Sequence, residues 1–485
     1  MSKSLYYYFF PRIQDGFFVG LLIAVWLIGP SLFSADGDLG RHITIGTYMI
    51  ENRNIPTRDI FSHTMTGERL VPHEWLAQVA LASAHALMGL SGDVVLAAIL
   101  IATTFTLTYR EMIRRNVSQI LALVITILAA FASSLHWIAR PHLFTFLLLA
   151  IWSYQLEYNS RKVWLFPIIM LIWANTHGAF IAGFVIWGAH MAGWVWDLLQ
   201  KQSTIQAGWH LFIIGIASFV VTLINPAGWH LWGTSVGYFG SQFLIDQTVE
   251  YKSPNFHNWS TWSFLAMLGL SLIMLSFRGR LRTHEALLLA GWTAMSLYSA
   301  RNIPLFAIIT APYLAQLIHP VIEEASMLRR LDQTITSVEK NLRGTFYPAL
   351  ATILLIGASI VPGQSNNIND FDPNRFPVSA VDWLHAHPQD GKMFNNFIWG
   401  GYLLYRLWPQ QLVFIDGQTD FYGEALSREY IQVSLLQTGW ENILKKHEVS
   451  WVIVQSDKPL VNGLREQLRW EIIYRDDTAT ILRKP

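Results

Sequence analysis

The sequence predicts a mainly α-helical membrane protein whose chain ends in a small α/β domain. Hydrophobic residues make up 52% of the 485 residues, charged residues make up only 14%, and the mean hydropathy is +0.31. Water-soluble domains contain about 25% charged residues, so this composition indicates a chain with many membrane spans. After residue 362 the charge content rises and helix-like and strand-like patterns alternate. This change predicts a separate water-exposed domain over residues 363–485.

Charge and cysteine content exclude several classes of function. The net charge is +1, which argues against nucleic acid as a partner. The chain has no cysteine, so disulfides, zinc thiolates and thiol catalysis are excluded. The position of the charges is therefore more informative than their sum.

Eleven apolar runs predict the spans of a polytopic domain over residues 1–362. A helix needs about 17 to 25 apolar residues to cross a bilayer. The first run is expected to stay as a helix, because no small-residue cleavage site follows it. Residues 74–90 are also apolar, but we place them along the membrane surface, within a first outer loop over residues 35–92. The expected spans are 16–34, 93–109, 118–136, 141–158, 163–175, 179–198, 207–224, 260–277, 284–300, 302–318 and 345–362.

The basic residues predict the orientation. With the N-terminus in the cytoplasm, the six inner segments hold 15 Lys or Arg in 67 residues, whereas the outer loops of the membrane part hold 7 in 105. This is the asymmetry of the positive-inside rule. The last span then delivers the C-terminal domain to the extracytoplasmic side. We expect a bacterial inner membrane, and an amphipathic surface helix within residues 319–344.

Under this orientation, the unusual polar residues near the span ends all lie on the outer face. Ionisable groups near hydrocarbon are costly and normally face a cavity or each other, so a shared outer cavity is expected. Structural readings remain open: an Asn or His can bond backbone at a helix break, and an Arg can reach the headgroups. The candidate binding residues are His42, His73, Glu74, Arg140, His142, Asn175, His177, Glu250, Lys252 and Arg301.

Asp36 and Asp38 open the first outer loop and are the candidate catalytic residues. An Asp-x-Asp pair can chelate a divalent metal such as Mg²⁺ or Mn²⁺. Alternatively, one carboxylate can serve as a base while the other tunes it, and an apolar flank raises the pKa of either.

These motifs resemble the C-type (GT-C) integral-membrane glycosyltransferases, which include protein O-mannosyltransferases, aminoarabinose transferases of lipid A and oligosaccharyltransferases. The chain is most similar to a bacterial group with the first-loop patterns seen here in Asp36–His42, Ile55–Gly67 and His73–Leu76. The resemblance implies a sugar donor on a polyprenyl phosphate, and an acidic residue of the first loop that activates the acceptor. Asp36 matches that residue best and Asp38 is the next match. At Gly40 and Arg41, many relatives carry aromatic residues instead.

The C-terminal domain has a weaker resemblance to the family. Residues 393–402 and 413–420 predict a strand, a glycine turn and a second strand that ends at Asp416. This order resembles the tryptophan-aspartate-tyrosine-glycine segment of oligosaccharyltransferases, which helps to hold the acceptor peptide, although glycine replaces its aspartate. The resemblance adds Trp399, Tyr402 and Asp416 to the binding residues. The alternative is a small α/β domain in which Gly400 and Gly401 permit close packing.

The function expected from the sequence is transfer of a sugar from a polyprenyl-phosphate donor to an extracytoplasmic glycan, lipid or protein. Arg140, Arg301, Lys252 or a bound metal would stabilise the departing phosphate. Inversion at the anomeric carbon is expected, because no second carboxylate is placed as a nucleophile. Three alternatives remain: a noncatalytic protein of envelope polysaccharide assembly, a transporter, and a ligase that joins whole lipid-linked glycans.

Overall fold

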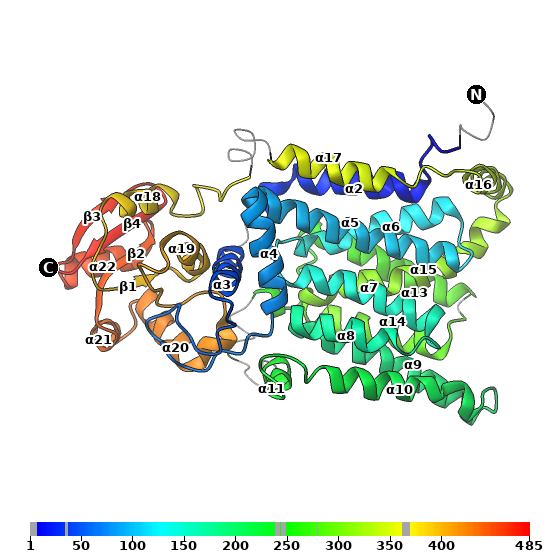
Figure 1. Cartoon of the computed structure of the whole chain (residues 1–485), viewed down its shortest axis with the longest axis horizontal. Coiled ribbons are helices and arrows are strands. Elements are labelled where there is room, and N and C mark those ends of the chain that lie inside the picture. Colours follow the sequence, from blue (N-terminus) through cyan, green and yellow to red (C-terminus); the bar gives the residue numbers. More distant parts are fainter. Residues whose placement is uncertain (1–6, 34–36, 238–242, 244–248, 279, 361–368) are drawn as a thin grey trace.

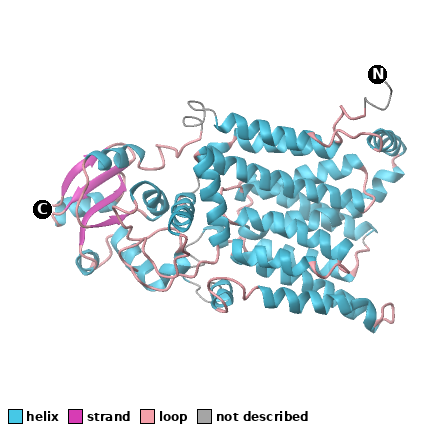
Figure 2. Ribbon diagram, in the orientation of Figure 1, coloured by secondary structure: helices cyan, strands magenta, loops and turns pink. Residues whose placement is uncertain are grey.

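The computed structural model describes residues 7–33, 37–237, 243, 249–278, 280–360 and 369–485. A bundle of helices carries a smaller α/β domain at one end (Figures 1 and 2). The bundle helices are α2 (Ile13–Leu27), α5 (Leu90–Arg114), α6 (Gln119–Ser133), α7 (His142–Asn159), α8 (Leu165–Thr176), α9 (Ile181–Leu199), α10 (Ile205–Val221), α13 (Trp262–Arg278), α14 (Thr283–Tyr298), α15 (Ile303–Glu324) and α17 (Tyr347–Ile360).

Each apolar run of the sequence coincides with one of these helices. The first run differs in detail, because α2 ends at Leu27 and residues Gly29–Leu32 form the 3₁₀ helix η1. Pro30 explains the break, since proline has no backbone N–H and disfavours a helical residue before it. Further along the chain, α6 begins where the Ser118 hydroxyl accepts the backbone N–H of Leu121 at 3.2 Å.

The chain is a multi-pass membrane protein. Within the described segments, five helices are long and apolar enough to cross a membrane, namely α5, α6 with η2 (Ser134–His136), α9 with η3 (Gly178–Phe180), α13 with η6 (Trp259–Thr261), and α15 with η7 (Ala300–Asn302). Five further apolar helices have between 10 and 17 residues. Large apolar side chains such as Ile216, Leu272 and Ile353 are exposed on the bundle, as expected for contact with lipid. Eleven spans remain a prediction.

Two helices of the first loop cover the end of the bundle that faces the α/β domain. Helix α4 (Trp75–Met88) lies across the ends of the bundle helices, roughly perpendicular to them, and α3 (Asp38–Asn52) lies between α4 and the α/β domain (Figure 1). A helix along the membrane surface would have this orientation, and the surface position of residues 74–90 stays a prediction. At the opposite end, the amphipathic helix α16 (Ser326–Glu339) occupies the segment expected to be a surface helix.

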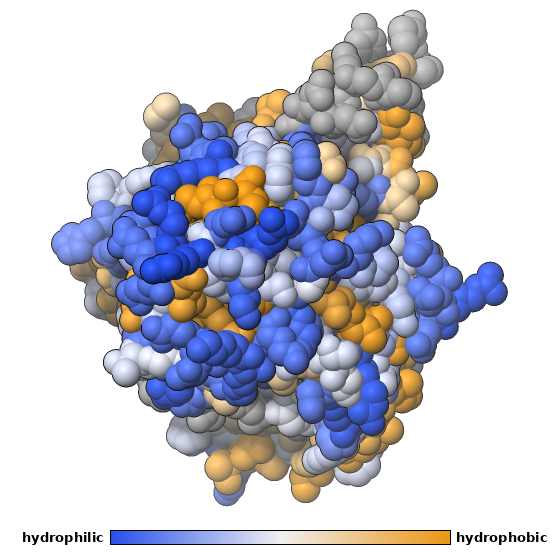
Figure 3. All heavy atoms as spheres, turned by 90° about the vertical axis from the view of Figure 1, so that its left-hand side faces the viewer, coloured by the Kyte–Doolittle hydropathy of each residue, from blue (hydrophilic) through white to orange (hydrophobic). Residues whose placement is uncertain are grey.

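The α/β domain contains a four-stranded sheet in the order β1-β2-β4-β3. Strands β1 (Lys392–Asn395) and β2 (Val449–Gln455) are parallel, and β4 (Ala479–Arg483) pairs antiparallel with β2 and with β3 (Glu471–Arg475). The helices are α18 (Val378–Ala386), α19 (Gly400–Leu407), α20 (Thr419–Ser434), α21 (Trp440–Lys446) and α22 (Pro459–Gln467), together with η8 (Phe397–Trp399). Its outer face is mainly hydrophilic (Figure 3).

The second strand expected before Asp416 does not form. Val413 makes only an isolated bridge with Ser62 of the first loop. The Asn395 side chain explains this, because its Oδ1 accepts the backbone N–H of Phe414 at 2.8 Å and its Nδ2 donates to the carbonyl of Ile415 at 2.8 Å. A side chain thus replaces the neighbouring strand and holds the segment that leads into the site.

Helices α3 and α19 pack at very close range through glycines. A Cβ built at Gly40 would lie 2.5 Å from the Gly401 carbonyl oxygen, and one at Gly401 would lie 2.2 Å from the Gly37 carbonyl oxygen. No side chain fits at those distances, so the glycines allow the two backbones to touch. The sequence predicted close packing at Gly400 and Gly401 within the α/β domain, whereas the structure places it against the start of α3.

Candidate functional site

A cavity of about 1350 Å³ opens where the first loop, the bundle and the α/β domain meet. Its polar part is lined by residues from α3, from the turns before α7 and after α8, and from the segment after Ile415. Its apolar part runs between α9 and α14 and is lined by Ile181, Ala182, Val185, Ala189, Leu287, Leu288, Trp292 and Met295. A charged chamber and an apolar groove therefore form one continuous space.

Asp38, the first residue of α3, faces Arg140 from the turn before α7. Asp38 Oδ2 lies 3.1 Å from Arg140 Nη2, and both side chains are largely buried. Arg140 Nη1 also lies 3.9 Å from Glu250 Oε1. Burial raises the pKa of Asp38 to about 6, helped by the negative charges of Asp416, Glu250 and Glu74 and opposed by Arg41. A carboxylate with this pKa can accept a proton near neutral pH.

Arg41, one turn along α3, connects the bundle to the α/β domain. Its Nη1 donates to Gln418 Oε1 at 3.0 Å, and its Nε lies 3.8 Å from Asp416 Oδ1. Asp416 in turn accepts the backbone N–H of Gln418 at 2.8 Å and the hydroxyl of Tyr422 at 3.1 Å. Burial raises the pKa of Asp416, whereas Arg41 lowers it. The domain thus contributes a charged wall to the site through an ordered turn.

Gly417, in that turn, lies directly against the candidate base. A Cβ at this position would lie 1.9 Å from Asp38 Oδ1. Only a residue without a side chain allows the turn to approach Asp38 this closely.

Histidines surround Glu74 on the other side of the chamber. Its Oε1 lies 3.8 Å from His73 Nε2 and 3.8 Å from His177 Nε2, and its Oε2 lies 3.9 Å from His42 Nδ1. Burial and the charge of Arg41 hold the pKa of His42 well below its usual range, so this histidine is neutral. His42 therefore offers a hydrogen-bond donor and an acceptor rather than a fixed positive charge.

A third arginine lies at the wall of the chamber formed after α14. Arg301 Nη1 donates to the hydroxyl of Tyr251, and its guanidinium lies 5.1 Å from the centre of that ring. Arg301 and Tyr251 both line the cavity. The chamber therefore holds three arginines, Arg41, Arg140 and Arg301.

Nine of the residues predicted from the sequence line this cavity: Asp38, His42, His73, Glu74, Arg140, His142, His177, Glu250 and Arg301. Asp36 lies outside the described residues. Asp416 takes part through Arg41.

The remaining predicted residues lie elsewhere. Asn175 accepts the indole N–H of Trp75 at 2.6 Å and donates to the carbonyl of Ile224 at 3.0 Å, so it joins three segments as its structural reading expected. Lys252 is exposed and does not line the cavity.

Trp399 and Tyr402 are fully buried inside the α/β domain and line no part of the cavity. The indole N–H of Trp399 donates to the carbonyl of Arg375 at 2.7 Å, and the Tyr402 ring packs on Phe371 with centroids 4.9 Å apart. In the structure both have core positions.

Gln418, Tyr251 and Asp420 line the cavity and were not among the residues predicted from the sequence. Gln418 and Asp420 follow the segment ending at Asp416, so they could have been found by extending that segment. Tyr251 stands between the predicted residues Glu250 and Lys252 in the sequence, and this position could have indicated that it belongs to the site.

The described part of the chamber does not gather three carboxylate or imidazole ligand atoms around one point. The Asp38 carboxylate is matched with Arg140 instead. Without the geometry of Asp36, a Mg²⁺ or Mn²⁺ site here remains a prediction from the Asp-x-Asp pair.

No protein-family model and no curated protein sequence matches the chain. Solved structures do match. The oligosaccharyltransferase of Archaeoglobus fulgidus in its apo form has a TM-score of 0.58 at 12% identity, over 90% of this chain and 69% of that one. The aminoarabinose transferase ArnT from Cupriavidus metallidurans has a TM-score of 0.50 at 15% identity, over 96% of both chains. Both are GT-C proteins, so the chain has the GT-C fold predicted from its first loop.

Proposed function

We propose that the protein is a membrane glycosyltransferase that moves a sugar from a polyprenyl-phosphate carrier to an extracytoplasmic acceptor. The observation that carries this proposal is the continuity of one cavity, which joins the Asp38–Arg140 pair to an apolar groove between α9 and α14. A donor with a charged phosphate and a long hydrocarbon tail needs both environments in one space.

The groove suits the lipid tail of the donor. Its lining side chains are aliphatic or aromatic, and they come from two neighbouring helices of the bundle. Burial of apolar surface is worth about 25 cal/mol per Å², so a tail along this groove is held without specific polar contacts. The archaeal oligosaccharyltransferase AglB, solved with an inhibitory peptide and a dolichol-phosphate, has a TM-score of 0.57 at 12% identity over 90% of this chain and 69% of that one, which supports a lipid phosphate as ligand of this fold.

The arginines suit the phosphate. Arg140 and Arg301 line the chamber into which the groove opens. One guanidinium can donate two parallel hydrogen bonds to two oxygens of a phosphate. Its positive charge also stabilises the negative charge that develops on a leaving phosphate.

The acceptor enters from the α/β side. Gln418, Asp420, Tyr430 and Lys458 of this domain line the cavity opposite the bundle. They offer amide, carboxylate, hydroxyl and ammonium groups, which can bind a polar acceptor such as a glycan or a peptide.

Chemistry then needs one base. The acceptor oxygen forms a bond to the anomeric carbon, the bond from that carbon to the phosphate oxygen breaks, and polyprenyl phosphate leaves. Either Asp38 or Asp36 accepts the proton of the acceptor. Asp38 is favoured by its position in the cavity, and Asp36 is favoured by the resemblance of the first loop. A single displacement inverts the anomeric configuration.

The orientation proposed for the chain follows its basic residues. It has a cytoplasmic N-terminus and an extracytoplasmic α/β domain in a bacterial inner membrane. The polar chamber lies at one end of the bundle rather than at its middle, which favours a transferase over a transporter with a midplane site.

The test is release of polyprenyl phosphate by the protein in lipid nanodiscs, offered a panel of polyprenyl-phosphate sugars with and without Mg²⁺ or Mn²⁺. We expect release by the wild type and by Asp382→Asn, whose side chain is 62% exposed on the α/β domain. Asp36→Asn and Asp38→Asn should each lose most of it. Folded wild-type protein that releases nothing from any donor would refute the proposal and favour a ligase of whole glycans or a noncatalytic role.

A further inference from the structure

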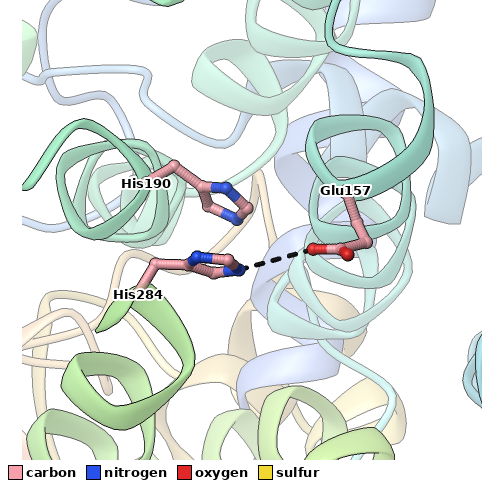
Figure 4. A group of neighbouring side chains, drawn as sticks. All are labelled: Glu157, His190 and His284. Atoms are coloured by element: carbon pink, nitrogen blue, oxygen red, sulfur yellow. Dashed lines mark ion pairs between the residues drawn. The ribbon is translucent and has the colours of Figure 1, made fainter. Parts of the chain in front are cut away.

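A second cluster of chemically active side chains lies away from the cavity chamber and has no part in the proposed transfer. Glu157 of α7, His190 of α9 and His284 of α14 face one another from three helices (Figure 4). Their ligand atoms all lie within 4.8 Å of one another. Glu157 is 15 residues along α7 from His142 of the chamber, so at 1.5 Å per residue the two are about 22 Å apart.

The cluster has the composition of a zinc-type site. Zn²⁺ is often bound by two imidazoles and one carboxylate, and a water molecule then takes the fourth position of the tetrahedron. His284 Nε2 lies 3.4 Å from Glu157 Oε2, which is already the separation of two ligands in a tetrahedral site with bonds of about 2.0–2.2 Å. Only His190 has to move closer, by about 1.5 Å at most.

The two histidine rings lie face to face. They stack with centroids 4.2 Å apart and an angle of 25° between planes. His284 Nε2 is buried, and its polar neighbour is Glu157 Oε2 at 3.4 Å, beyond a good hydrogen bond. A contact this long satisfies a buried ring nitrogen poorly, and a metal bond between the two atoms would satisfy both.

A glycine brings the helices close at this level. A Cβ at Gly193, one turn beyond His190 on α9, would lie 3.1 Å from the Cβ of His284. The absence of a side chain there lets α14 bring His284 against α9.

The surrounding charges fit a divalent cation. Arg282 Nη2 holds the other carboxylate oxygen of Glu157 at 2.5 Å, as outer groups commonly orient a ligating carboxylate. Arg115 Nη2 lies 3.6 Å from Glu157 Oε2, the oxygen beside His284, and makes shorter pairs with Glu111 and Glu285 at 3.2 and 2.6 Å. An ion at Glu157 Oε2 would therefore displace only the longest of the three Arg115 contacts. Three carboxylates thus face two guanidiniums, which leaves one negative charge to attract the ion.

We propose that Glu157, His190 and His284 bind one Zn²⁺-type transition-metal ion, which ties α7, α9 and α14 together. The site lies next to the end of the apolar groove, since Ala189 and Leu287 of its lining are neighbours of His190 and His284 along their helices. The ion therefore fixes the spacing of the two helices that form the groove. Nitrogen ligands distinguish this site from an oxygen-ligated Mg²⁺ or Mn²⁺ site at Asp36 and Asp38.

The test measures metal binding directly, in nanodiscs and with any affinity tag removed. Chelator-treated wild type is titrated with Zn²⁺, and with Co²⁺ as a coloured substitute, in excess Mg²⁺. We expect one equivalent bound per chain. His190→Gln and His284→Gln should each weaken the affinity about 100-fold or more, because each removes a ligand.

Two variants serve as controls. His319→Gln removes a histidine of α15 that pairs with Glu323 at 3.4 Å, outside the cluster, and should bind as the wild type does. Asp38→Asn should also keep its Zn²⁺, which separates this inference from the transferase proposal. Absence of a bound equivalent in the wild type, or equal affinity in the histidine variants of the cluster, would overturn the site. Glu157→Gln is not used to decide the test, because it removes the ion pairs with Arg115 and Arg282 as well as a metal ligand.

Discussion

Asp38 and Arg140 lie 3.1 Å apart, although 102 positions separate them along the chain. One opens the first helix of the outer loop and the other stands in the turn that leads into α7. Their pairing places a candidate base beside a candidate phosphate ligand at the same point of the cavity. The proposed reaction needs both a base for the acceptor proton and a cation for the departing phosphate in this one chamber.

Replacing Arg140 should therefore remove most of the activity. Arg140→Gln loses the charge that stabilises the leaving phosphate, and we expect the rate of polyprenyl-phosphate release to fall about 100-fold or more. Arg140→Lys should recover only part of it, since an ammonium cannot replace the planar fork between Asp38 and Glu250. The control is Arg465→Gln on the exposed face of α22. A normal rate in Arg140→Gln would exclude this role.

The rate should depend on pH through Asp38. Its pKa is raised to about 6, mainly by burial, and only the ionised form accepts a proton. We expect kcat/KM to be level above pH 6 and to fall about tenfold for each unit below it. Stopped assays across this range with saturating acceptor would measure the profile.

Glu250 provides an internal check on that assignment. Its negative charge raises the pKa of Asp38, so Glu250→Gln should move the acid limb of the profile to lower pH. A limb that stays in place in this variant would mean that a group other than Asp38 controls the rate.

Gly417→Ala should damage the site without unfolding the protein. Its Cβ would lie 1.9 Å from Asp38 Oδ1, so the turn or the carboxylate must move away from Arg140. We expect at least about a tenfold loss of activity, because small displacements of catalytic groups are costly. Gly269→Ala on α13 meets no atom within 4 Å and should behave as the wild type. Full activity in Gly417→Ala would show that this contact is dispensable.

The helices and most of the chamber could be predicted from the sequence because membrane spans leave strong signals. Apolar runs located the bundle helices, and polar residues at the ends of those runs located nine residues of the cavity. A helix that ends in a polar cluster is a local pattern, and the positive-inside rule then assigns every cluster to one side.

Residues of the α/β domain were harder to assign, because their roles depend on contacts between distant segments. Trp399 and Tyr402 looked functional from their motif, yet they fill the domain core. Val413–Ile415 read as a strand, but the Asn395 side chain takes the hydrogen bonds that a second strand would have made. Likewise, nothing in the separate sequences of α7, α9 and α14 indicates that Glu157, His190 and His284 meet.

The apolar groove can be tested by filling it. Gly291 of α14 lines the cavity, and a Cβ built there meets no atom within 4 Å, so Gly291→Phe should place its ring in the groove without disturbing the bundle. Each buried methylene of a lipid tail is worth about 0.8 kcal/mol. The displaced tail should therefore lower kcat/KM for a full-length polyprenyl donor about tenfold or more.

A donor with a short isoprenyl chain does not reach along the groove, so the same variant should use it as well as the wild type does. Gly291→Ala, which adds only one carbon, serves as the matched control with both donors. The ratio of the two kcat/KM values in each protein isolates the contribution of the tail from general damage. An equal loss for long and short donors would show that the tail does not run between α9 and α14.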